Sequence, residues 1–164
     1  MIAAPGLDVP LELRLRLADL YAAYDATLDE NELEKWPDFF TEACLYKVIP
    51  RENYELGLPV GMLSLESRAM LADRVVALRE TMFFAPRTLR RLVGAPTLRS
   101  VNPDGYRLTA TFALFETMLN EPSALFLCGR FYDRVVDDGG ALRFAERVCV
   151  TDATNVPTSL VFPI

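Results

Sequence analysis

Apolar residues recur at helical spacing near the start of the chain. After Pro10, a residue type that suits the first turn of a helix, one apolar stripe consists of Leu13, Leu17, Leu20, Tyr21 and Tyr24. Residues 29–31 break this stripe, so the helix should end there. A short second helix is predicted from about Asn31 to Trp36, stopped near Pro37.

A third helix is predicted in the middle of the chain. Ser64 or Ser67 can cap it, it should end near Thr81, and its apolar face consists of Leu71, Val75 and Leu78. Before it, residues 45–49 are predicted as a first strand. Residues 51–63 contain Gly57, Pro59 and Gly61, which indicates an irregular segment.

The second half of the chain follows the two-residue period of strands. Long strands are predicted at residues 87–101, 106–119, 124–136 and 142–150, separated by turn signals at 102–105, 120–123 and 137–140. In the second of these strands, one face carries Tyr106, Leu108, Ala110, Phe112 and Leu114. In the last, Leu142, Phe144, Glu146 and Val148 should face away from Arg143, Ala145, Arg147 and Cys149.

The order of these elements, helices first and a meander of long strands afterwards, predicts an α+β fold. We expect one domain over residues 1–164, with helices packed on the concave face of a strongly bent, mostly antiparallel sheet. Apolar residues make up 51% of the chain, which is ordinary for a globular domain with one core.

The charge and the apolar runs exclude several classes of partner. A net charge of −6 argues against binding to nucleic acid or to an anionic membrane surface. The apolar run at residues 124–128 is far shorter than the ~20 residues of a spanning helix. Residues 1–10 lack a basic start and a long apolar run, so we expect no signal peptide and a cytoplasmic location.

The chain has no histidine, and this excludes much catalytic chemistry. A Ser-His-Asp triad, a 2-His-1-carboxylate iron site and a Rieske cluster all require histidine. The three cysteines, Cys44, Cys128 and Cys149, are odd in number and widely spaced, which favours buried thiols in a reducing compartment over disulfides or a zinc site. We therefore expect no metal-binding residue in this chain.

The remaining candidates for chemistry are carboxylates and tyrosines inside the bent sheet. Each of Asp25, Asp38, Asp73 and Glu146 could be a buried acid or base, although ion pairing is the simpler interpretation. The pairs Asp73-Arg74 and Arg79-Glu80 suggest solvated or inter-element ion pairs, and Glu146 could meet Arg130 and Arg134. Tyr21, Tyr24 and Tyr46 are interpreted as core aromatics with hydroxyls at the rim.

Several ordered motifs resemble a known family. They are EKWPDFF at residues 34–40, PRENYELGLP at 50–59, LSLESRAML followed by DRV at 63–75, LRETM at 78–82 and LVGAP at 92–96. Together they resemble the small (beta) subunits of Rieske-type aromatic-ring-hydroxylating oxygenases, first that of salicylate 5-hydroxylase and next that of terephthalate dioxygenase. The resemblance covers nearly the whole chain.

The resemblance implies a cystatin-like cone that serves as a structural subunit without catalytic, cofactor-binding or metal-binding residues. The Rieske 2Fe-2S centre and the mononuclear Fe(II) would lie in a partner large (alpha) subunit, with NAD(P)H used through a separate reductase. The implied assembly has three large and three small chains, and the implied substrate is an aromatic carboxylate similar to salicylate, with terephthalate or anthranilate as alternatives. One departure is Arg90-Arg91, where relatives commonly carry Arg-His; a contact with a neighbouring chain would differ there.

A second hypothesis remains open. The same cone could be a free-standing isomerase, dehydratase or hydrolase that uses an Asp and Tyr pocket, because fold alone does not fix function. The apolar LVFPI at residues 160–164 and the segment 51–63 favour an obligate partner, because a monomer would leave both exposed.

Overall fold

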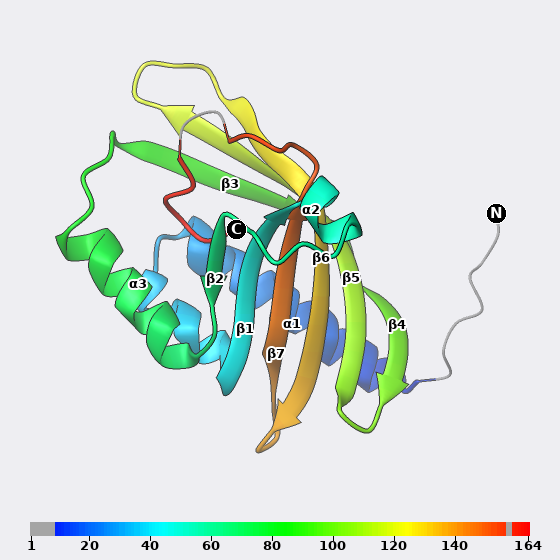
Figure 1. The fold of residues 1–164 in the computed structure, drawn as a ribbon. Coiled ribbons are helices and arrows are strands. Elements are labelled where there is room, and N and C mark those ends of the chain that lie inside the picture. Colours follow the sequence, from blue (N-terminus) through cyan, green and yellow to red (C-terminus); the bar gives the residue numbers. More distant parts are fainter. Residues whose placement is uncertain (1–8, 157–158) are drawn as a thin grey trace.

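The structure, a computed structural model, describes residues 9–156 and 159–164 (Figure 1). The segment considered above as a signal peptide lies mostly outside the described residues. The helices are α1 (Leu11–Asp29), the 3-10 helix η1 (Leu33–Phe39), α2 (Arg51–Glu55) and α3 (Arg68–Glu80). The strands are β1 (Phe40–Pro50), β2 (Leu63–Leu65), β3 (Arg87–Val93), β4 (Thr97–Asn102), β5 (Gly105–Met118), β6 (Ala124–Asp138) and β7 (Ala141–Thr151).

All seven strands form one curved sheet in the order β2-β1-β7-β6-β5-β3, and β4 also pairs with β5. Every pairing is antiparallel except that of β1 with β7, which is parallel. The parallel pair joins a strand from the first third of the chain to the last strand. The predicted α+β cone with a mostly antiparallel sheet is thereby confirmed.

Among the described helices, α1, η1 and α3 cover one face of the sheet and α2 lies on the other. Figure 1 shows α1 crossing behind the strands and α2 in front of them. The predicted stripe of α1 is buried at Leu17, Tyr21, Tyr24 and Leu28, and that of α3 at Leu71, Val75 and Leu78. Ser67 caps α3 by accepting a hydrogen bond from the Met70 amide at 3.2 Å. Among the described helices, none is both long and apolar enough to cross a membrane.

Several predicted boundaries are wrong. The first strand begins at Phe40 instead of residue 45, the second helix is a 3-10 helix that includes Pro37, and the irregular segment contains α2. The predicted strand at 87–101 is two strands, because residues 94–96 interrupt it. Pro96 has no amide hydrogen for a ladder, and Gly94 lies so close to β5 that a Cβ would be 2.7 Å from the Thr111 hydroxyl.

The apolar segment 160–164 is part of the chain's own core, which corrects the prediction that it needs a partner to cover it. Ile164 is fully buried, and Val161 is 4% exposed. The Tyr24 hydroxyl donates to the Ile164 oxygen at 2.9 Å, and the Ile164 amide donates to the Tyr46 hydroxyl at 2.8 Å. Arg74 donates to the oxygens of Leu160 and Val161.

Candidate functional site

An irregularity in β7 places a charged residue inside the cone. The register of β6 with β7 shifts by one residue, so that Arg134 pairs with Glu146 but Val135 pairs with Phe144. A β-bulge of this kind reverses the alternation of side chains. Phe144 and Arg147 consequently share the core face, and both are fully buried. The predicted alternation, with Arg147 opposite Phe144, is wrong for this reason.

Arg147 is held by a buried carboxylate on the neighbouring strand. Its Nε lies 3.1 Å from Asp133 Oδ1 and its Nη2 lies 2.8 Å from Asp133 Oδ2, in the bidentate geometry that arginine favours. The Tyr21 hydroxyl also donates to Asp133 Oδ2. Both side chains of this ion pair are completely inaccessible to solvent. The Asp133 carboxylate is therefore fully committed to internal partners.

Aromatic rings enclose the Arg147 guanidinium. Its carbon lies 3.9 Å from the ring centre of Phe144, 4.2 Å from Tyr24, 4.3 Å from Phe131 and 4.9 Å from Tyr21. Desolvated cation–π contacts of this type contribute up to about 2 kcal/mol each. The interior between α1 and the sheet is consequently occupied by protein side chains.

The three candidate tyrosines are core residues, as predicted, but their hydroxyls do not lie at the rim. Tyr21 is 2% exposed, and Tyr24 and Tyr46 are not exposed at all. Desolvation raises the pKa of all three phenols, so they are neutral at physiological pH. Tyr24 accepts a hydrogen bond from the Trp36 indole at 3.0 Å. All three hydroxyls are engaged in bonds within the chain.

The four candidate carboxylates do not converge. Asp38 and Asp73 are exposed, and Glu146 lies on the outer face of the sheet, 3.4 Å from Arg107 and 3.8 Å from Arg134. The expected pairing of Glu146 with Arg134 is confirmed, and Arg107 takes the place expected for Arg130. The inter-element pairing of Arg79 is also confirmed, although its partner is Glu34 and not Glu80.

Asp25 is the one candidate carboxylate with an unusual environment. Its Oδ1 atom is buried without a hydrogen-bond partner, and desolvation raises the pKa of the carboxyl to about 6. Arg147 and Arg91 oppose this shift by favouring the ionised form. A pKa near 6 suits a general base, but this carboxyl borders an interior that Arg147 and its rings already fill.

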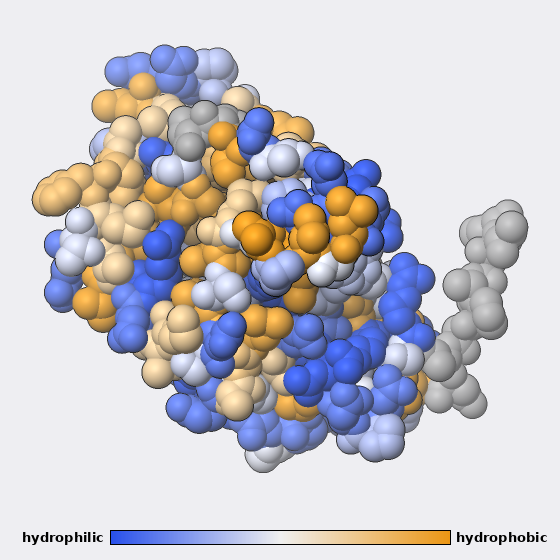
Figure 2. Space-filling model, viewed as in Figure 1, coloured by the Kyte–Doolittle hydropathy of each residue, from blue (hydrophilic) through white to orange (hydrophobic). Residues whose placement is uncertain are grey.

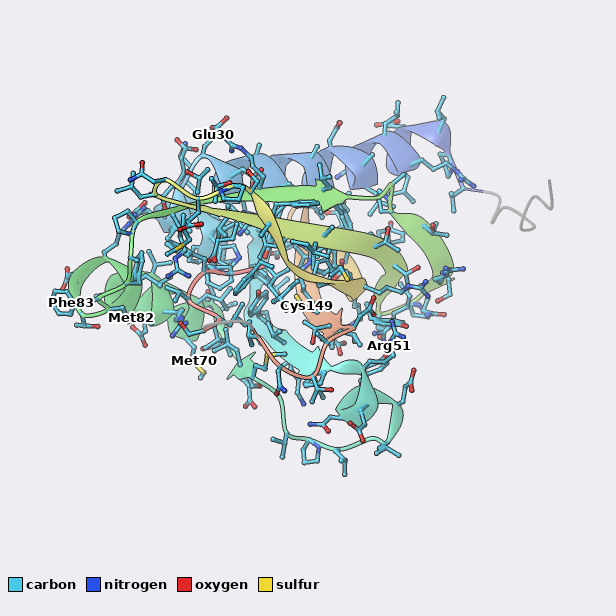
Figure 3. All side chains as sticks on the ribbon, turned by 90° about the horizontal axis from the view of Figure 1, so that it is seen from above. Glu30, Arg51, Met70, Met82, Phe83 and Cys149 are labelled. Carbon is cyan, nitrogen blue, oxygen red and sulfur yellow. The ribbon has the colours of Figure 1, made fainter. Side chains whose placement is uncertain are left out.

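The interpretation of the cysteines holds for Cys44 and Cys149, which are buried and free, whereas Cys128 is half-buried. Desolvation raises the pKa of the Cys149 thiol to about 12 and that of the Cys44 thiol to about 11. Figure 3 shows Cys149 in the middle of the molecule, while Phe83 points away from its body. Within the described part of the chain, no group of three or more His, Cys, Asp or Glu side chains is placed to hold a metal ion.

At the Arg90-Arg91 position, considered above as a contact with another chain, Arg91 is internal, whereas Arg90 is exposed. Arg91 is 8% exposed and lies 2.7 Å from Asp29 at the end of α1. Its Nη2 donates to the main-chain oxygen of Pro163. Arg91 therefore joins α1 to the segment 160–164. No local pattern signals this role, because the position of that segment depends on long-range contacts.

Comparisons with known proteins agree with this architecture. Residues 9–148 match the model of the SnoaL-like domain family. The anthranilate 1,2-dioxygenase small subunit of Burkholderia cepacia is 33% identical over 141 residues, which are 86% of this chain and 88% of the relative. Subunit beta 1 of the terminal oxygenase component of terephthalate 1,2-dioxygenase, from a Comamonas species, is 31% identical over 92% of this chain and 97% of its own length.

A solved structure supports the same assignment. The beta subunit assigned to an aromatic-ring-hydroxylating dioxygenase of Novosphingobium aromaticivorans superimposes with a TM-score of 0.84 at 35% identity, over 93% of this chain and 97% of that one. The resemblance to the terephthalate enzyme's subunit is confirmed, while the resemblance to the salicylate enzyme's subunit stays a prediction. The chain belongs to the small (beta) subunits of aromatic-ring-hydroxylating dioxygenases, which here have a SnoaL-like fold.

Proposed function

We propose that this chain is the structural small subunit of a multicomponent oxygenase that hydroxylates an aromatic carboxylate. The observation that carries the proposal is the filled interior. Arg147 pairs with Asp133 there and the Tyr21 hydroxyl donates to the same carboxylate, while the hydroxyls of Tyr24 and Tyr46 bond the main chain of Ile164. The two curated relatives named above belong to enzymes named for carboxylate substrates, anthranilate and terephthalate. Salicylate is a further candidate of the same chemical class.

The metals of such an enzyme would lie in a partner large subunit. A chain without histidine cannot supply the ligands of a Rieske 2Fe-2S centre or of a 2-His-1-carboxylate iron site, so the residues of this chain do not fit either group. We assign to this chain, as one domain over residues 1–164, the role of binding and stabilising the large subunit. The proposed assembly contains three chains of each kind, is cytoplasmic, and receives electrons from NAD(P)H through a separate reductase.

Co-expression tests the partnership. The chain and the large subunit encoded beside it should co-purify as one hetero-oligomer that hydroxylates salicylate, anthranilate or terephthalate. Sedimentation would give its stoichiometry, and iron analysis of the separated small chain should find no stoichiometric metal. A small chain that stays monomeric beside the large subunit would refute the proposal.

A free-standing enzyme is the second candidate, and the raised pKa of Asp25 is the observation that favours it. The variants Asp25→Asn and Asp38→Asn separate the two functions in an assembled complex. Under the structural role, both should keep turnover within a few-fold of the parent, whereas a positioned general acid or base contributes about 10²–10⁴. A loss of that size in Asp25→Asn alone, with assembly and iron content intact, would favour direct catalysis.

A further inference from the structure

Arginines gather on the outer face of the sheet, opposite the face that carries α1 and α3. Arg99 comes from β4, Arg107 from β5, Arg130 and Arg134 from β6, and Arg51 from the start of α2. Arg107 and Arg134 are direct cross-strand partners, a pairing of like charges that Glu146 offsets by contacting both. We call this set of five residues the arginine face.

Four of the five residues of the arginine face are held in place by the chain itself. Arg51 pairs with Asp152, and Arg99 Nε donates to the Thr109 hydroxyl at 2.8 Å. Asp133 also lines one groove but is paired with the buried Arg147. The five arginines therefore exceed the four other carboxylates there (Glu55, Asp104, Glu146 and Asp152) by one, on a chain whose net charge is −6. The four guanidinium groups fixed in this way lose little side-chain entropy when an anion binds near them.

Arg130 is the arginine of this face without an internal partner. Among the described residues, no hydrogen bond or ion pair engages its guanidinium, and the residue is exposed. It stands between two adjoining grooves of about 380 and 490 Å³, and it lines both together with Tyr54 and Tyr132. The rings of Tyr54 and Tyr132 stack 5.0 Å apart, so α2 is fixed against the sheet beside the grooves.

Apolar residues continue this surface beyond α2. Leu56, Leu58 and Val60 are 66%, 46% and 68% exposed. Figure 2 shows hydrophobic side chains over the segment that follows α2 and hydrophilic ones over the lower ends of β4 to β7. Arginine and tyrosine beside exposed aliphatic residues are the composition of a protein interface. Small-molecule sites enclose most of their ligand, and these grooves are open along one side.

We propose that the arginine face docks a segment of the large subunit that presents carboxylate side chains, one of which pairs with Arg130. The inference rests on the proposed function, which supplies the partner, while the charge of the face determines its chemistry. A bidentate arginine–carboxylate pair matches the free guanidinium, and Leu56, Leu58 and Val60 cover apolar side chains next to it. Nucleic acid is not the occupant, because the chain as a whole repels polyanions.

The test measures binding of the large subunit to small-chain variants by titration in a reconstituted complex. Arg130→Glu should weaken binding by roughly ten- to a hundredfold, because it places like charges together. Arg130→Lys keeps the charge but loses the bidentate geometry, so its loss should be smaller. Lys35→Glu is the matched control, with the same change of charge on η1, at the other face; it should bind like the parent chain. Rising salt should weaken binding of the parent chain more than that of Arg130→Glu.

Each outcome decides between the proposals. Equal binding by Arg130→Glu and Lys35→Glu, with unchanged thermal unfolding, overturns the arginine face as the docking site while the subunit function stands. A parent chain that does not bind the large subunit overturns the proposed function itself. If Arg130→Glu abolishes only self-association of the small chain, the occupant is a second copy and the present assignment is wrong. Should Arg130→Glu not fold, Arg130→Gln takes its place, and the same comparison with Lys35→Glu applies.

Discussion

Replacement of Arg147 by methionine should strongly destabilise the fold. The variant Arg147→Met removes the positive charge but keeps an apolar chain that can fill the space between Phe144 and Tyr24. Asp133, which is 3% exposed, then keeps only the Tyr21 hydroxyl among the partners of its carboxylate. An uncompensated buried charge of this kind typically costs about 3–5 kcal/mol.

The loss of cation–π contacts adds to this cost, but the four contacts share one guanidinium and do not add independently. We therefore expect a total loss of about 4 kcal/mol in the free energy of unfolding. Since the free energy of unfolding of a domain is typically about 5–15 kcal/mol, the variant should be close to the limit of stable folding. The double variant Arg147→Met with Asp133→Asn removes both charges and leaves Tyr21 an acceptor. It should recover at least half of the loss.

Pulse proteolysis in urea measures these differences within the assembled complex, because the band of the small chain is followed separately. Arg143→Met, on the same strand, is the control. Its pair with Asp138 is partly exposed, so the loss should stay below about 1 kcal/mol. The reasoning fails if Arg147→Met unfolds at the same urea concentration as Arg143→Met, or if the double variant is no more stable than the single one.

Three further predictions follow from single groups in the core. Folding raises the pKa of the Asp25 carboxyl to about 6 from an unfolded value near 4, so its ionisation opposes folding and wild-type stability should fall as pH rises from about 4 to 6. Asp25→Asn lacks this loss and should be more stable than wild type by about 2 kcal/mol at pH 8 in thermal unfolding. Equal pH dependence of the stability of the two proteins would contradict the prediction. In the native chain, iodoacetamide should label Cys128 first and should label Cys44 and Cys149 only on unfolding, because the last two thiols are buried. Peptide mass spectrometry would show the order of labelling, and early labelling of Cys149 would disprove the prediction. Ile164→Asp places a charge in the core and should cost about 3 kcal/mol or more, whereas a variant as stable as wild type in urea would mean that this segment does not pack as described.

The two long strands β5 and β7 show how far the sequence alone could lead. In β5 the alternation predicted the buried face correctly at Leu108, Ala110, Phe112 and Leu114, because the ladder is regular through those positions. In β7 the same rule failed, because the bulge near Glu146 depends on the pairing with β6 and has no signature in a single sequence.

The candidate site was predictable in its members but not in their arrangement. Burial of Tyr21, Tyr24 and Tyr46 followed from helical and strand spacing, yet the position of Asp133 opposite Arg147 depends on inter-strand register. Segment 160–164 was recognised as apolar. Its site of burial, against Tyr24 and Tyr46, depends on contacts across more than a hundred residues that no local pattern encodes.

The burial of residues 160–164 has a consequence for synthesis of the chain. The hydrogen bonds of Ile164 join it to residues 140 and 118 positions earlier, so they cannot form until residues 160–164 have emerged from the ribosome. During translation Tyr24, Trp36 and Tyr46 have emerged long before the segment that completes their surroundings. Until residues 160–164 follow, the nascent chain therefore presents an open aromatic core to which chaperones can bind.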